Sequence, residues 1–196
     1  AAFVGIVLTA FLLVTVSAFD LPLGLPTALA GIGTALGVSA LARRSPIVLM
    51  RDISWGVLPL VGGLFVLVAA VESTGVVGVL ANLLQHAAKS DPVTAAWGAG
   101  ALLAFISNIM NNLPAGLIAS ETVAQAHVPR LVIDNLLIGV DLGPNLSVTG
   151  SLATILWLQV IRREGEEVGF LQFFRVGAVA MPVALFTALG ARLLIG

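Results

Sequence analysis

The 196-residue sequence is 59% hydrophobic and only 10% charged, with a mean hydropathy of +1.09, whereas soluble domains are roughly 45–50% apolar and about 25% charged. Nine Lys and Arg and ten Asp and Glu side chains are too few to cover a water-facing surface, and the apolar excess also excludes a disordered chain. The net charge of −1 provides no basic surface for nucleic acid. The composition predicts an all-α polytopic membrane protein.

The chain contains no Cys, which excludes disulfides, thiolate metal sites and redox dithiols. It also lacks the His-Glu-x-x-His, Gly-x-Ser-x-Gly and P-loop motifs, so we expect neither an enzyme nor a cofactor. The sequence opens on an apolar stretch at Ala1 without a preceding basic region, which indicates part of a longer protein rather than a signal peptide.

Apolar stretches of about 20 residues predict membrane-spanning helices. Three such stretches come first, at residues 1–19, from near Pro22 to 41, and at 54–71. Residues 76–89 place apolar side chains on one helical face opposite polar ones, which predicts an interfacial helix, with the end of a span as the alternative.

The stretches at residues 92–110 and 113–128 are short for two full crossings and are joined by Asn111 and Asn112. A re-entrant hairpin over residues 92–128 therefore fits better than two spans. Residues 131–140 and 148–160 are each too short to cross alone, so we expect one discontinuous helix over residues 130–161. A final span is expected at residues 170–194, bent or tilted at Pro182. The positive-inside rule places Arg43, Arg44 and Arg51 in the cytoplasm. The expected number of membrane crossings between them and the next basic loop is even, so Arg162 and Arg163 also lie in the cytoplasm.

The first candidate site is the expected hairpin tip. Ser107 and three amide side chains lie within six residues between apolar stretches, where polar groups are costly unless hydrogen-bonded, and Pro114 and Gly116 allow the chain to turn there. Amides both donate and accept, so they suit a neutral polar solute or a hydrated ion. A polar loop at the membrane surface is the alternative. The residues expected to bind substrate at this tip are Asn108, Asn111, Asn112 and Pro114.

The second candidate site is the expected helix break. Gly143-Pro144 cannot continue a helix without losing hydrogen bonds, and unwinding frees carbonyl and N–H groups of the kind that broken-helix transporters use for substrate and ions. Small and hydroxylated residues also pack transmembrane helices together, which is the alternative. The residues expected to bind substrate at this break are Gly143, Asn145, Ser147, Thr149 and Ser151.

Two acidic residues lie in the first part of the broken helix. Asp134 and Asp141 are seven residues apart and share a helical face. A carboxylate near the bilayer centre has a raised pKa and takes up a proton readily, so both are candidates for proton coupling, with Asp141 the stronger because it adjoins the break. Glu121 is expected to pair with Arg130 or to lie at the outer face. His86 and His127 are expected to be interfacial residues rather than proton relays.

The stretches at residues 107–117 and 139–157, followed by Arg162-Arg-Glu-Gly165, closely resemble arsenite efflux permeases of the ArsB type. The resemblance runs through the whole chain as the C-terminal half of such a permease. It implies an ion-transporter-superfamily repeat, one half of an inverted-repeat transporter, with a scaffold at residues 1–91 and a transport region at 92–196.

The same resemblance implies export of arsenite and antimonite across the cytoplasmic membrane, by proton antiport or with a partner ATPase. The partners implied are the metalloid hydroxide, protons, lipid and the N-terminal half of the permease. Trivalent arsenic is mainly an uncharged hydroxide at neutral pH, and a site without thiolates releases it readily. Alternatives are a sodium-coupled anion carrier or sodium/proton antiporter of the same superfamily, a channel, and a membrane-embedded scaffold or enzyme subunit.

Overall fold

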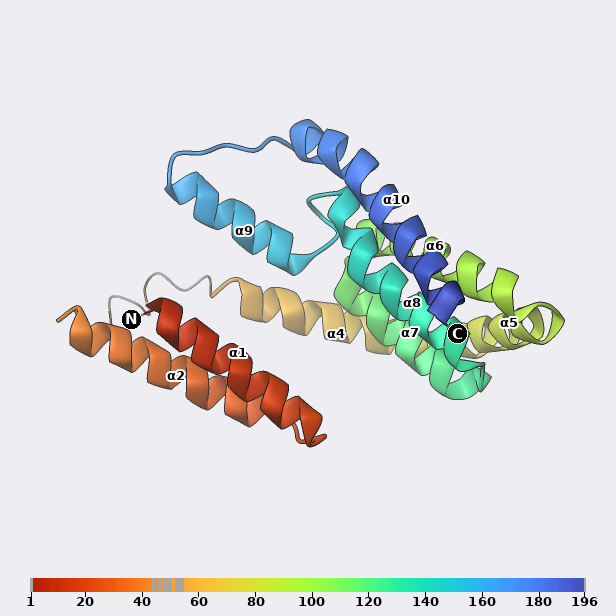
Figure 1. The fold of residues 1–196 in the computed structure, drawn as a ribbon, viewed down its shortest axis with the longest axis horizontal. Coiled ribbons are helices and arrows are strands. Elements are labelled where there is room, and N and C mark those ends of the chain that lie inside the picture. Colours follow the sequence, from red (N-terminus) through yellow and green to blue (C-terminus); the bar gives the residue numbers. More distant parts are fainter. Residues whose placement is uncertain (1, 44, 46, 48–50, 52–54, 196) are drawn as a thin grey trace. The chain divides into compact units, whose positions relative to one another are not determined.

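The structure is a computed structural model that describes residues 2–43, 45, 47, 51 and 55–195 (Figure 1). Its regular elements in these ranges are all helices, which confirms the all-α polytopic class. The chain forms two compact units, Ala1–Val57 and Leu58–Gly196. The helices are α1 (Ala2–Ala18), α2 (Gly24–Leu41), α4 (Val57–Ser73), α5 (Val76–Ser90), α6 (Pro92–Met110), α7 (Asn112–Ala126), α8 (Arg130–Leu142), the 3₁₀ helix η1 (Gly143–Leu146), α9 (Leu152–Arg163) and α10 (Phe170–Ile195).

In the first unit, α1 and α2 pack against each other. Gly5 makes this contact possible, because a Cβ at that position would lie 2.3 Å from Cγ2 of Thr34. α2 is long and apolar enough to cross a membrane, whereas α1 is shorter. The expected start of the third span at Ser54 lies outside the described residues, and α4 begins at Val57.

The turn between α4 and α5 bends the chain by 71°. Gly75 takes a positive φ of 79° there, a conformation that favours glycine because it lacks a Cβ. α5 buries the small side chains Val77, Ala81 and Ala88, whereas the larger Leu83 is 63% exposed. α5 is thus amphipathic as expected, and its place at the membrane interface remains a prediction.

The second unit is organised around α6, α7 and α8 (Figure 1). α6 meets α7 at Asn111, the hairpin expected from the sequence. By length and composition α6 can cross a membrane, while α7 is too short for a full crossing. The expectation that both arms are too short for a full crossing is therefore wrong for α6, and it applies only to α7. The re-entrant course of residues 92–128 remains a prediction.

α6 and α8 run parallel with their backbones in contact. A Cβ on Gly100 would lie 2.6 Å from the carbonyl oxygen of Asn135, one on Gly139 would lie 2.2 Å from that of Gly100, and one on Gly143 would lie 2.3 Å from that of Ala104. Gly139 and Gly143 form a small-xxx-small pattern, which permits close helix packing. This register brings the C-terminal end of α6 beside the end of α8.

α10 runs antiparallel to α8 and covers both α6 and α8. Met181, Leu185 and Leu189 are buried and pack with Ala104 in one apolar cluster. Pro182 lies inside this 26-residue helix, as expected for the final span.

The expected break in the helix is present, while a single span over residues 130–161 remains a prediction. α8 ends at Leu142, the turn of 3₁₀ helix follows at once, and residues 147–151 are not helical before α9 begins at Leu152. Gly143 and Pro144 are both buried in this break, where Pro144 cannot donate the hydrogen bond that an uninterrupted helix requires.

Candidate functional site

The two polar stretches singled out from the sequence lie side by side. The backbone N–H of Asn112 donates to the carbonyl of Gly150 at 2.8 Å. Nδ2 of Asn111 donates to the carbonyl of Thr149 at 3.2 Å. The parallel packing of α6 and α8 therefore places the hairpin tip against the non-helical residues 147–151, which we call the unwound segment.

Asn108 makes most of the connections between these stretches. Its Nδ2 donates to the carbonyls of Ala104 and Gly143 at 2.8 and 2.7 Å. Its Oδ1 accepts from the backbone N–H and the hydroxyl of Ser147, both at 3.0 Å, and its own carbonyl accepts from the Thr149 hydroxyl at 3.1 Å. The amide of Asn108 is thus fully used within the protein, so its geometry supports a positioning role.

Asn111 takes a backbone conformation that residues with a side chain rarely adopt, with φ 75° and ψ 148°. Its Oδ1 accepts from the N–H of Leu113 at 3.3 Å, which caps the start of α7. Such conformations cost about 1–3 kcal/mol and collect at functional sites. The sequence carried this signal weakly, because Asn tolerates positive φ better than most residues.

The remaining expected substrate-binding residues divide by their contacts. Pro114 and Gly143 are buried in the packing. The hydroxyls of Ser147 and Thr149 lie 3.1 Å apart, and Oγ of Ser151 accepts from the N–H of Ala153 as the N-cap of α9. These residues shape the unwound segment.

Three polar side chains at the break remain open to a ligand. Asn145 is exposed and donates through Nδ2 to the carbonyl of Leu142 at 2.9 Å, which leaves its Oδ1 accessible. Asn112 is half-buried and Asp141 exposed, and within the described ranges neither side chain is assigned a hydrogen bond or an ion pair. Together they offer amide and carboxylate groups beside the break.

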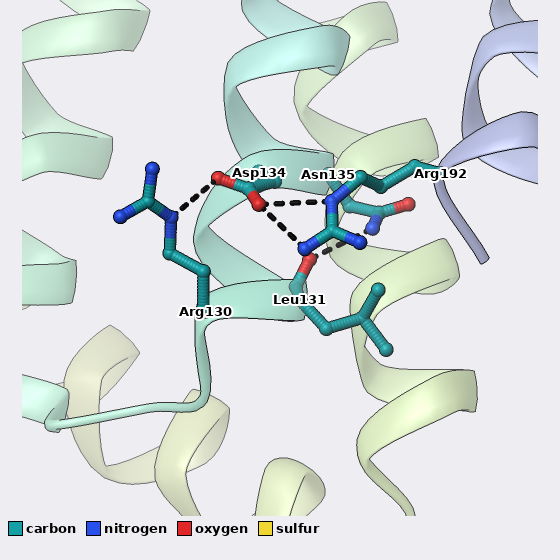
Figure 2. A network of polar contacts seen from close by, with 5 residues as sticks. All are labelled: Arg130, Leu131, Asp134, Asn135 and Arg192. Atoms are coloured by element: carbon teal, nitrogen blue, oxygen red, sulfur yellow. Dashed lines mark hydrogen bonds and ion pairs between the residues drawn. The ribbon is translucent and has the colours of Figure 1, made fainter. Parts of the chain in front are cut away.

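Asp134 lies in a different environment from Asp141 (Figure 2). Its Oδ2 contacts Nε and Nη2 of Arg192 at 2.9 and 2.8 Å, and its Oδ1 accepts from Nε of Arg130 at 3.0 Å. Opposite charges favour the ionised carboxylate, so this geometry gives proton coupling by Asp134 less support than it gives Asp141. Arg130 thus pairs with Asp134, while Glu121 is exposed.

Among the described residues, the ring of each histidine contacts a nearby backbone carbonyl. Nδ1 of His86 donates to the carbonyl of Asn82 at 2.6 Å, and Nδ1 of His127 donates to that of Gln125 at 3.0 Å. Both side chains are exposed near the expected outer edges. These contacts fit the expected interfacial role.

The model of the ArsB family, described as arsenical pump membrane protein, matches residues 2–195. The chain is 30% identical to an arsenical pump membrane protein of Yersinia enterocolitica and 32% identical to one of Escherichia coli, covering 87% of this chain and 42% of each relative. It is 31% identical to an uncharacterized transporter of Mycobacterium bovis over 82% of this chain and 38% of that protein. No solved structure matches significantly. The chain therefore spans about two fifths of the length of the curated relatives it matches, and it belongs to the arsenical pump membrane protein family.

Proposed function

We propose that this chain contributes one half of a permease that exports arsenite and antimonite across the cytoplasmic membrane as neutral hydroxides. Export is coupled to proton entry by alternating access. Family membership supports the substrate class, since the relatives are named arsenical pumps. The other half of the permease completes the site, and a separate ATPase is an optional partner.

The observation that carries the proposal is the setting of Asp141. This exposed carboxylate lies in the last turn of α8, and η1 separates it from the unwound segment. A carboxylate without an opposite charge beside it takes up a proton more readily than one in an ion pair. In the proposed cycle Asp141 carries the coupled proton, while the open amides of Asn112 and Asn145 hydrogen-bond the hydroxyls of the solute.

Hydrogen bonding around the break favours a neutral solute over sodium. The carbonyl of Gly143 accepts from Asn108, and that of Thr149 accepts from Asn111. The carbonyl oxygen of Asn145 lies against Gly177 of α10. Sodium prefers several oxygen ligands together. The carbonyls of Gly143 and Thr149 already accept hydrogen bonds and that of Asn145 is covered by α10, whereas the open amides both donate and accept.

Transport into inverted membrane vesicles tests the proposal. With the full-length permease we expect arsenite to accumulate when a pH gradient is applied without sodium. Asp141→Asn keeps the size of the side chain and abolishes protonation, so proton-driven accumulation falls by about tenfold or more at an unchanged protein level. Glu121→Gln, an exposed acid on α7, is the matched control and transports as the wild type does.

Three outcomes would contradict the proposal. Strict sodium dependence points to the sodium-coupled alternative. Transport that never exceeds the outside concentration points to a channel. Unchanged proton-driven accumulation in Asp141→Asn removes that residue from the coupling step.

A further inference from the structure

The ion pair between Asp134 and Arg192 connects α8 to α10 across 58 residues of sequence (Figure 2). Both side chains are partly buried, at 18% and 20% exposure, whereas the second arginine on the same carboxylate, Arg130, is 83% exposed. Exposed ion pairs contribute little because water competes for both charges, while breaking a buried pair leaves an uncompensated charge. Of the two arginines, Arg192 thus makes the contact with structural consequences.

A second contact joins α10 to the same broken helix further along. A Cβ on Gly177 would lie 2.5 Å from the carbonyl oxygen of Asn145 and 2.6 Å from that of Leu146. The backbone of α10 therefore lies directly against η1, immediately before the unwound segment. We call this contact and the Asp134–Arg192 pair the two-point attachment.

Pro182 lies between the two points on α10. A proline inside a helix removes one backbone hydrogen bond and allows the helix to bend at that position. The part of α10 around Gly177 and the part around Arg192 can therefore shift relative to each other unless each is fixed to α8 or η1. The apolar cluster of Met181, Leu185 and Leu189 packs α10 against α6 and α8, but it provides no hydrogen bond or ion pair that would fix the position of α10.

We propose that Arg192 is a positioning residue for the transport site. Its pair with Asp134 fixes the C-terminal part of α10, and through the two-point attachment it sets how η1 and the unwound segment lie against α10. Asp134 then has a structural role, and proton coupling is left to Asp141. This positioning role rests on the proposed function only where arsenite transport is the quantity measured.

A reporter cysteine tests the position of the unwound segment without any substrate. Val148 is half-buried in that segment, and this chain has no Cys of its own, so Val148→Cys reacts alone in a full-length permease freed of other cysteines. We expect Arg192→Gln to change the rate of labelling by a water-soluble maleimide by about 2- to 30-fold, the range that such couplings span. Arg130→Gln, which removes the exposed arginine from the same carboxylate, leaves the rate within about twofold of the wild type.

Arsenite transport gives the second readout, measured in the same variants without the reporter. We expect Arg192→Gln to lower Vmax/KM by about tenfold at a normal protein level, and Arg130→Gln to leave it unchanged. The double variant Asp134→Asn with Arg192→Gln is no worse than the more damaging single variant, because both remove the same contact.

The outcomes separate this inference from the proposed function. If the wild type does not transport arsenite, the proposed function fails, and the labelling rates still decide the role of Arg192. If the wild type transports and Arg192→Gln changes neither labelling nor Vmax/KM, the positioning role is refuted, as it is if Arg130→Gln has the same effect. If the Arg192→Gln protein is not produced at a normal level in the membrane, the Arg192→Lys variant is tested instead, since lysine keeps the charge but cannot place two nitrogens on Oδ2. Wild-type labelling and transport in Arg192→Lys would overturn the proposal.

Discussion

Adding one methyl group between α6 and α8 tests the close packing on which the site depends. In Gly139→Ala the new Cβ lies 2.2 Å from the carbonyl oxygen of Gly100, where ordinary contact begins at 3.4 Å, so the helices must separate locally by about 1.2 Å. A backbone oxygen cannot rotate away as a flexible side chain can. Overpacking of this kind costs about 1–3 kcal/mol, and this cost lowers the Tm of the full-length permease.

The measurement is thermal unfolding of the purified full-length permease in detergent, with arsenite transport measured in parallel. Gly100→Ala meets the carbonyl oxygen of Asn135 at 2.6 Å, so its effect has the same sign and is smaller. Gly98→Ala is the matched control on the same helix, because nothing lies within 4 Å of its new Cβ. Its Tm is unchanged or higher, since alanine favours a helix by about 1 kcal/mol over glycine. Equal Tm values for all three variants would refute the close contact.

Asn108→Ala leaves the carbonyl of Gly143 and the N–H of Ser147 without their present partner, so it costs about 1–3 kcal/mol and lowers both Tm and transport. Asn112→Ala removes an open amide, and we expect an unchanged Tm with a higher KM for arsenite; a lower Tm without a change in KM would contradict that role. At the start of α6, the Thr94 hydroxyl is the main cause that lowers the pKa of Asp91 below 3.8. The stabilising effect of the ionised Asp91 is therefore complete at pH values above the unfolded-state pKa, and it is lost as the pH falls through the lower folded-state pKa. In a pH series of Tm, Asp91→Ala lies below the wild type at neutral pH and converges with it in acid, and parallel curves would contradict this.

Much of the architecture follows from local sequence. Gly143-Pro144 predicts the end of α8 because proline cannot donate the backbone hydrogen bond, and the structure places the break there. The amide-rich turn at Asn111 predicts a hairpin tip, and α6 ends at Met110. Helical periodicity also predicts the amphipathic α5, although its small residues, rather than its leucines, are the buried ones.

The role of each amide could not be read from the sequence. Asn108 and Asn112 are equally polar and lie four residues apart. Asn108 nevertheless spends its hydrogen bonds on residues that lie 35 to 41 positions away in the sequence. Which donors are used internally depends on which carbonyls lie nearby, and only the packing of α6 on α8 determines that. The same is true of Asp134 and Asp141, which share one helical face but differ in whether an arginine of α10 reaches them.

The sequence by itself determined that this chain is helical, resides in a membrane and has a helix break at Gly143-Pro144, because composition and proline chemistry act locally. Tertiary structure decided which polar groups remain open to a ligand. Long-range contacts such as Arg192 with Asp134 and Gly100 with Gly139 depend on the register between helices, and no single segment encodes that register.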